Sequence, residues 1–130
     1  MQSVVTEDYQ VTVGDQFAES VQFSALDELA AATAMAVPTR VSLHLRDFDG
    51  GTVVKRVDSA GGADSPDGTL TITDSGDPIL LAWAMTTTGL TPGKLYYGDL
   101  QLIGASGFPN PWTPYKVRVM ILTDNTEVTA

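Results

Sequence analysis

The DFDG segment at 47–50 has the residue types that begin a calcium-binding loop. An EF-hand loop also carries a third oxygen ligand before its invariant glycine and a glutamate at its twelfth position. Here the glycine comes two positions early, and Asp58 occupies the twelfth position. The segment is therefore predicted to be a hairpin turn. Asp58, Asp64 and Asp67 are the remaining acids that could gather around a hard cation, but aspartate is also a common turn residue, and we assign no metal site.

The residues needed for other catalytic chemistry are few. The chain has one histidine, His44, on the polar side of its predicted strand, and no cysteine. Glycoside hydrolysis needs one carboxyl with a raised pKa in a cleft. Nearly every acid of this chain lies in or beside a turn, where it should be solvated. Glu19 and Asp99 lie within predicted strands, and we expect Glu19 to be partly buried and paired with Arg40 or Arg118. The sequence predicts no enzyme, no catalytic residue and no cofactor.

The aromatic residues are the candidates for contact with a partner. Phe108 and Trp112 lie on a loop stiffened by prolines, where they would lose little conformational entropy on binding. The alternative is that both fold back to cover one end of the domain. In the next-to-last strand, Tyr96 shares the side of the apolar residues and is predicted to be buried, with its hydroxyl bonded at the sheet rim. Gly98 on that side would leave room for a neighbouring side chain, whereas Tyr97 faces outward and is the third contact candidate.

Length and charge limit the classes of partner. The chain has 130 residues, enough for one domain with a core of its own, and a formal charge of −9. So acidic a chain is a poor partner for nucleic acid phosphates. No apolar run approaches the roughly 18 residues that span a membrane, and the N-terminus lacks the basic region of a signal peptide. We expect neither nucleic acid nor membrane among the partners.

Alternation of apolar and polar residues dominates the chain and predicts an all-β fold. Short alternating segments separated by turn signals are typical of a β-sandwich or barrel, here with about seven or eight strands. The strands are too close together for helical crossovers, so antiparallel pairing is expected. A short helix or ordered loop is predicted near 25–37, before Pro38. We assign residues 1–9 to an N-terminal arm and 10–130 to a single domain. The alternating stretches lie at 10–23, with an interruption at Gly14-Asp15, and at 40–46, 52–57, 69–74, 79–85, 91–102, which opens on a Pro-Gly turn, and 116–123.

Four motifs in order resemble the N-terminal domain of the tailed-phage baseplate upper protein family and related phage virion and tail domains. They are Gly-Asp-x-Phe at 14–17, the arginine-bracketed strand at 40–46, the block ITDSGDPILLAWAMTTTGLTPGKLYYGDLQL and the closing KVRVMILTDNTEVT. The resemblance covers nearly the whole chain and implies an immunoglobulin-like antiparallel sandwich without catalytic residues. The chain departs from the family at 24–38, which is longer than the turn expected there. It also ends at Ala130, where baseplate upper proteins continue into receptor-binding or trimerising segments.

The resemblance implies a structural virion protein, made in the host cytoplasm and carried on the tail, baseplate or neck. Its partners would be other phage structural proteins, with several copies set by the symmetry of the particle. The N-terminal arm could add a strand to a neighbour. A capsid decoration protein is the nearest alternative, and a carbohydrate- or receptor-binding module using Trp112, Phe108 and Tyr97 is the alternative from another class.

Overall fold

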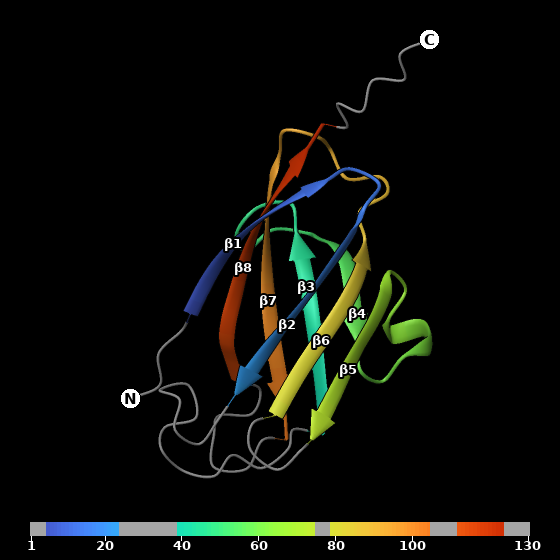
Figure 1. Cartoon of the computed structure of the whole chain (residues 1–130), viewed down its shortest axis with the longest axis vertical. Coiled ribbons are helices and arrows are strands. Elements are labelled where there is room, and N and C mark those ends of the chain that lie inside the picture. Colours follow the sequence, from blue (N-terminus) through green and yellow to red (C-terminus); the bar gives the residue numbers. More distant parts are fainter. Residues whose placement is uncertain (1–4, 24–38, 75–78, 105–111, 124–130) are drawn as a thin grey trace.

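The computed structural model describes residues 5–23, 39–74, 79–104 and 112–123. Two β-sheets pack face to face, which confirms the predicted all-β sandwich (Figure 1). The larger sheet has five strands in the order β1-β8-β7-β3-β4, and the smaller has three in the order β2-β6-β5. The strands are β1 (Val5–Thr12), β2 (Gln16–Phe23), β3 (Arg40–Arg46), β4 (Val53–Asp58), β5 (Gly68–Asp74), β6 (Ile79–Thr86), β7 (Leu95–Ile103) and β8 (Trp112–Leu122), with a short 3-10 turn, η2 (Gly62–Asp64), between β4 and β5.

The strand order is that of an immunoglobulin-like domain. In such domains strands A, B, E and D form one sheet, and strands C, F and G, with C′ in the variable type, form the other. Here β2-β6-β5 and β8-β7-β3-β4 reproduce the two sheets, with every neighbour antiparallel. β1 departs from the expected antiparallel pattern, since it pairs with β8 in parallel, from Val5 opposite Tyr115 to Thr12 opposite Leu122.

The segment predicted as an N-terminal arm therefore lies partly inside the sandwich. Residues 5–9 pair with β8 and belong to the sheet, so the boundary placed after residue 9 does not separate an arm from the domain. The Tyr9 ring lies 5.2 Å from the Phe17 ring, and the Tyr9 hydroxyl lies 2.8 Å from that of Tyr115. The hydroxyl contact joins β1 to β8, and the ring contact packs β1 against β2.

Alternate residues of both sheets fill the core, as the two-residue period predicts. Val41, Leu43 and Leu45 of β3 are fully buried, and Trp83 of β6 packs edge-on against Phe17 with ring centroids 5.7 Å apart. The remaining buried apolar side chains come mainly from the central strands β6, β7 and β8, so the two sheets share one core. They are Val57, Leu70, Leu81, Met85, Leu90, Tyr96, Leu100, Leu102, Tyr115, Val117, Val119 and Ile121.

The two adjacent tyrosines of β7 separate as predicted. Tyr96 is buried, and its hydroxyl accepts a hydrogen bond from the Thr91 backbone N–H at 2.8 Å. Tyr97 points to the outer face and is half-buried. A side chain at Gly98 would point inward, where its Cβ would lie 2.4 Å from Val117 Cγ2. The predicted space beside Gly98 is therefore filled by Val117.

The helix or ordered loop predicted near 25–37 lies outside the described residues. No helix in the part of the chain that the structure describes is long and apolar enough to cross a membrane.

Candidate functional site

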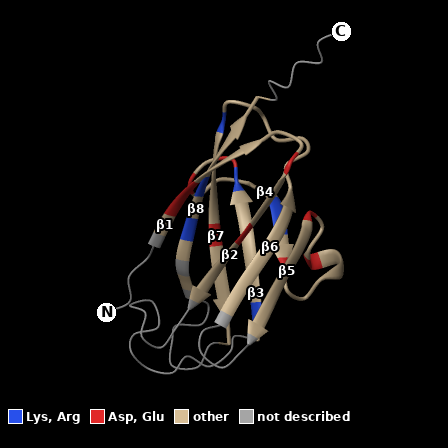
Figure 2. Cartoon of the chain, in the orientation of Figure 1, with Lys and Arg blue, Asp and Glu red and all other residues tan. Residues whose placement is uncertain are grey.

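The outer face of the five-stranded sheet concentrates the positive charge of an acidic chain (Figure 2). In β3 and β8, alternation turns the buried apolar residues inward and the basic ones outward, and in β4 Arg56 has the outward parity, opposite to that of buried Val57. Five of the seven Lys and Arg residues lie on this face as a result. They are Arg40, Arg46, Arg56, Lys116 and Arg118.

Carboxylates on the same face pair with these cations. Arg118 donates two hydrogen bonds to Asp8 of β1, from Nε at 2.6 Å and from Nη2 at 2.9 Å. Asp99 of β7 lies between two strands and pairs with Arg46 Nε at 3.6 Å and Lys116 Nζ at 3.9 Å. Because the cations are matched across neighbouring strands, the face is polar without a strong field of one sign.

Asp58 anchors the far end of this face. Its side chain is fully buried and accepts hydrogen bonds from Arg40, Arg56 Nη2 and the Ala60 backbone N–H. Burial acts to raise the pKa of the carboxyl, but these hydrogen bonds outweigh it and lower the pKa to about 2. Asp64 pairs with the same two arginines, at 3.4 and 3.8 Å.

The acids weighed as cation ligands are thus bonded to basic side chains. Asp58 and Asp64 face arginines, and Asp67 lies 3.6 Å from Lys55 Nζ. The described residues contain no group of three or more acids or histidines placed to hold a metal.

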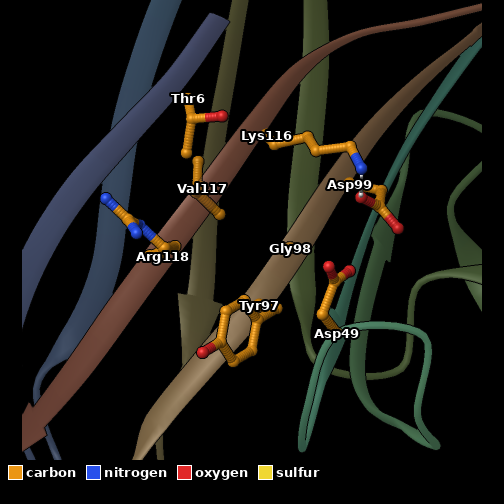
Figure 3. Close-up of a pocket in the computed structure, with 8 residues that line it drawn as sticks. All are labelled: Thr6, Asp49, Tyr97, Gly98, Asp99, Lys116, Val117 and Arg118. Carbon is orange, nitrogen blue, oxygen red and sulfur yellow. Dashed lines mark ion pairs between the residues drawn. The ribbon is translucent and has the colours of Figure 1, made fainter. Parts of the chain in front are cut away.

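A groove of about 320 Å³ opens on the outer face over β1, β8 and β7 (Figure 3). Tyr97, one of the three contact candidates, is among the residues that line the groove. Lys116 reaches along the wall toward Asp99, and Asp49 enters from the β3–β4 hairpin. The polar and aromatic side chains that line the groove are called the groove residues: Thr6, Asp49, Tyr97, Asp99, Lys116 and Arg118.

The hairpin itself carries a second surface. Of the four large hydrophobic side chains that stay exposed in the described ranges, three lie on it: Phe48 (59% exposed), Val53 (39%) and Val54 (37%). We call these three the hairpin patch. The DFDG segment forms the predicted turn, since Gly51 N–H donates to the Phe48 carbonyl at 2.8 Å and Gly50 has the left-handed φ of 78°.

The free edge of β4 is covered only in the second half of the strand, at Arg56 and Asp58. Arg56 N–H donates to Asp67 Oδ2 at 2.8 Å, and Asp67 N–H donates to the Arg56 carbonyl at 3.2 Å. Asp58 N–H likewise donates to Ser65 Oγ at 2.9 Å. Native sheets cover their edges in such ways to prevent unwanted pairing. Val53 and Val54 lie beyond these contacts.

The structure corrects the expectation for Glu19. Glu19 is exposed and pairs with neither Arg40 nor Arg118, which bind aspartates instead. It has the inward parity, opposite Trp83, but β2 is an edge strand and leaves the position open to solvent. His44 lies on the outer face as expected, but it is half-buried. Its burial and then the charges of Arg56 and Arg46 lower its pKa, which favours the neutral imidazole.

The other two contact candidates fall beyond what the structure describes. Phe108 lies outside the described residues. Trp112 begins β8, where its backbone is opposite Leu102, but its side chain is not described. The groove residues beside Tyr97 and the hairpin patch were not singled out from the sequence. Alternation turns Lys116 and Arg118 outward, but only the β7–β8 register brings them beside Tyr97.

Comparison with known proteins adds little. No family model and no curated protein matches the chain. Among solved structures, the chain is similar to part of a family 123 glycoside hydrolase from Clostridium perfringens, studied for glycolipid glycan hydrolysis. The sequence identity is 12% and the TM-score 0.44; the match covers 90% of this chain and 23% of the hydrolase, so the chain spans less than a quarter of that protein.

Proposed function

We propose that this chain is a non-catalytic structural module of a tailed-phage virion that docks on the tail, baseplate or neck. The hairpin patch is the observation that carries the docking role. Scattered exposed hydrophobic residues are normal on a protein surface, but a group of them marks an interaction site. Phe48 lies in the turn and Val53 and Val54 begin β4, where successive side chains point to opposite faces, so the exposed apolar side chains lie on both sides of the hairpin end, beside β4 backbone that the covering loop does not reach.

The phage context is supported by the motif resemblance, which runs from Gly14 to the closing strand, and by a sandwich fold of the kind that the resemblance implies. A chain without cysteine also suits assembly in a reducing cytoplasm. On the particle, the module would be present in several copies related by the particle's symmetry, each held by the same hairpin contact.

The test is incorporation into particles. Purified chain, carrying a tag, is incubated with particles assembled from a phage genome in which the chain's gene is deleted, and the amount that sediments with them is measured. We expect the triple variant Phe48→Ser, Val53→Thr, Val54→Thr to keep its fold and to lose at least about tenfold in bound amount, as interface centres do on truncation.

Leu122→Thr is the matched control, because Leu122 is 36% exposed but lies on β8, which β7 separates from the two strands of the hairpin. It should bind as the unchanged chain does. Equal incorporation of the triple variant, or no incorporation of the unchanged chain, would rule out docking through the hairpin patch. Running the assay on separated heads and tails distinguishes a tail module from a capsid decoration protein.

A further inference from the structure

The groove on the outer face is separate in chemistry from the apolar hairpin patch. It is lined by the side chains of four elements, namely β1, β7, β8 and the β3–β4 turn. Its volume of about 320 Å³ is at the small end of the range of ligand sites, roughly 300–1,000 Å³. From its charge balance, its aromatic wall and its unused hydrogen-bonding groups, we infer that the groove binds one unit of a neutral saccharide.

Charge balance argues for an uncharged ligand. The groove residues include two cations, Lys116 and Arg118, and two carboxylates, Asp49 and Asp99. Asp99 lies 3.9 Å from Lys116 Nζ, and Asp8 at the rim neutralises Arg118. A phosphate or carboxylate ligand would meet the two acids, and an ammonium ligand would meet the two cations. A neutral polyhydroxyl ligand meets neither repulsion, because its hydroxyls both donate and accept hydrogen bonds.

Tyr97 supplies the apolar surface that such a ligand also needs. The ring lies along β7 within the groove and is half-buried (Figure 3). A pyranose presents C–H groups on one face, and these pack against an aromatic ring, while its hydroxyls point to the polar groups around. Tyr97 is fixed by a central strand, paired with Arg118 on one side and Arg46 on the other, so little ordering is lost on binding.

Hydrogen-bonding capacity remains around that ring. Asp49 makes no ion pair within the described ranges and presents two acceptor oxygens from the turn. Arg118 uses Nε and Nη2 for Asp8, which leaves Nη1 to donate to a ligand. Lys116 Nζ is only loosely held at 3.9 Å and can donate as well. Arg118 therefore offers a donor on one side of the Tyr97 ring, and Lys116, Asp99 and Asp49 offer a donor and acceptors on the other (Figure 3).

The inference does not depend on the docking role, since it uses different side chains. Only the turn is shared, with Phe48 in the hairpin patch and Asp49 in the groove. If the hairpin variant loses particle binding but still binds saccharide, the saccharide inference is unaffected. If the chain binds particles but no saccharide, the docking role is unaffected.

The experiment is a titration of the ¹⁵N-labelled chain, followed by NMR, with D-glucose, D-galactose, D-mannose and N-acetylglucosamine, and with N-acetylneuraminic acid as the charged comparison. We expect at least one neutral sugar to shift the amides of Thr6, Tyr97, Asp99 and Arg118 together. The Kd for a single small ligand should lie in roughly the millimolar range.

Two variants and a control make the outcome decisive. Tyr97→Ala should weaken that binding by at least about tenfold through loss of the aromatic contact, and Asp49→Asn should weaken it less. Thr71→Ala, an exposed position on the outer face of the three-stranded sheet, should not change it. The inference is overturned if no neutral sugar shifts the groove amides, if Tyr97→Ala binds unchanged, or if the charged sugar binds more tightly than all the neutral ones.

Discussion

Arg40 donates hydrogen bonds to both carboxylate oxygens of Asp58, from Nε at 3.0 Å to Oδ1 and from Nη2 at 2.8 Å to Oδ2. The Asp58 side chain has no exposed surface, whereas that of Arg40 is 36% exposed. The pair joins the first residue of β3 to the last residue of β4, at the end of the sheet opposite the hairpin. The buried ion pair therefore holds the edge strand β4 against β3 at this end of the sheet. At the opposite end, the side chains of the hairpin patch are exposed.

Removing the charge of Asp58 should destabilise the fold. Asp58→Asn keeps the volume but turns an amide toward Arg40 and Arg56, which lose their buried partner. We expect the free energy of unfolding to fall by about 3–5 kcal/mol, measured by urea denaturation. Asp64→Asn is the control, since Asp64 pairs with the same arginines from a half-exposed position, and it should cost less than about 1 kcal/mol. Similar losses for the two variants would contradict the buried role of Asp58.

The same pair predicts how stability depends on pH. The folded-state pKa of Asp58 is about 2, below the roughly 3.9 of an unfolded aspartate. A lowered pKa adds stability that is fully present above the unfolded value and is lost as pH falls toward the folded one, here about 2 kcal/mol between pH 5 and pH 2. The stability gap between the unchanged chain and Asp58→Asn should therefore shrink over this range. A gap that stays constant from pH 5 to pH 2 would show that Asp58 does not titrate as proposed.

Gly98 should tolerate no side chain unless Val117 is shortened. In Gly98→Ala the new Cβ would lie 2.4 Å from Val117 Cγ2, with Leu43 and Leu45 at 3.4 Å behind it. Overpacking of this kind costs about 1–3 kcal/mol of stability. We expect the double variant Gly98→Ala, Val117→Ala to lose less than the sum of the two single variants in thermal denaturation. Strictly additive losses would mean that the two side chains do not compete for the same space.

The Thr87 hydroxyl should stabilise the β1–β2 turn. It accepts a hydrogen bond from Gly14 N–H at 2.9 Å and donates to the Asp15 carbonyl at 2.6 Å, and Thr87 is buried. Thr87→Val keeps the shape but leaves both backbone groups unpaired, at a cost of about 1–3 kcal/mol. Amide exchange of Gly14 should also accelerate. Thr88→Val, at the exposed neighbouring position, is the comparison and should change neither quantity.

Features with a two-residue period could be predicted from the sequence. Tyr96 and Tyr97 take opposite faces because successive strand residues must. The DFDG turn followed from its local chemistry. Alternation says which face a residue points to, not whether anything covers that face. Glu19 points inward but lies on an edge strand, so its predicted burial was wrong.

Features that depend on strand neighbours could not be predicted. β1 pairs with β8 across more than a hundred residues of chain, and in parallel, which no local pattern signals. The groove exists only because this pairing places Thr6 beside Lys116, and because the β7–β8 register places Tyr97 beside Arg118. The exposure of Val53 and Val54 likewise depends on β4 being the last strand of its sheet.

Hydrogen–deuterium exchange of the chain, free and bound to particles, tests the docking role most directly. Backbone amides that become buried in an interface or paired with a partner strand exchange more slowly. We predict that binding slows exchange at residues 47–54, which contain the hairpin patch, and leaves 69–73 of β5 unchanged. Unchanged exchange at 47–54 in the bound chain, with slowing elsewhere, would contradict docking through this hairpin.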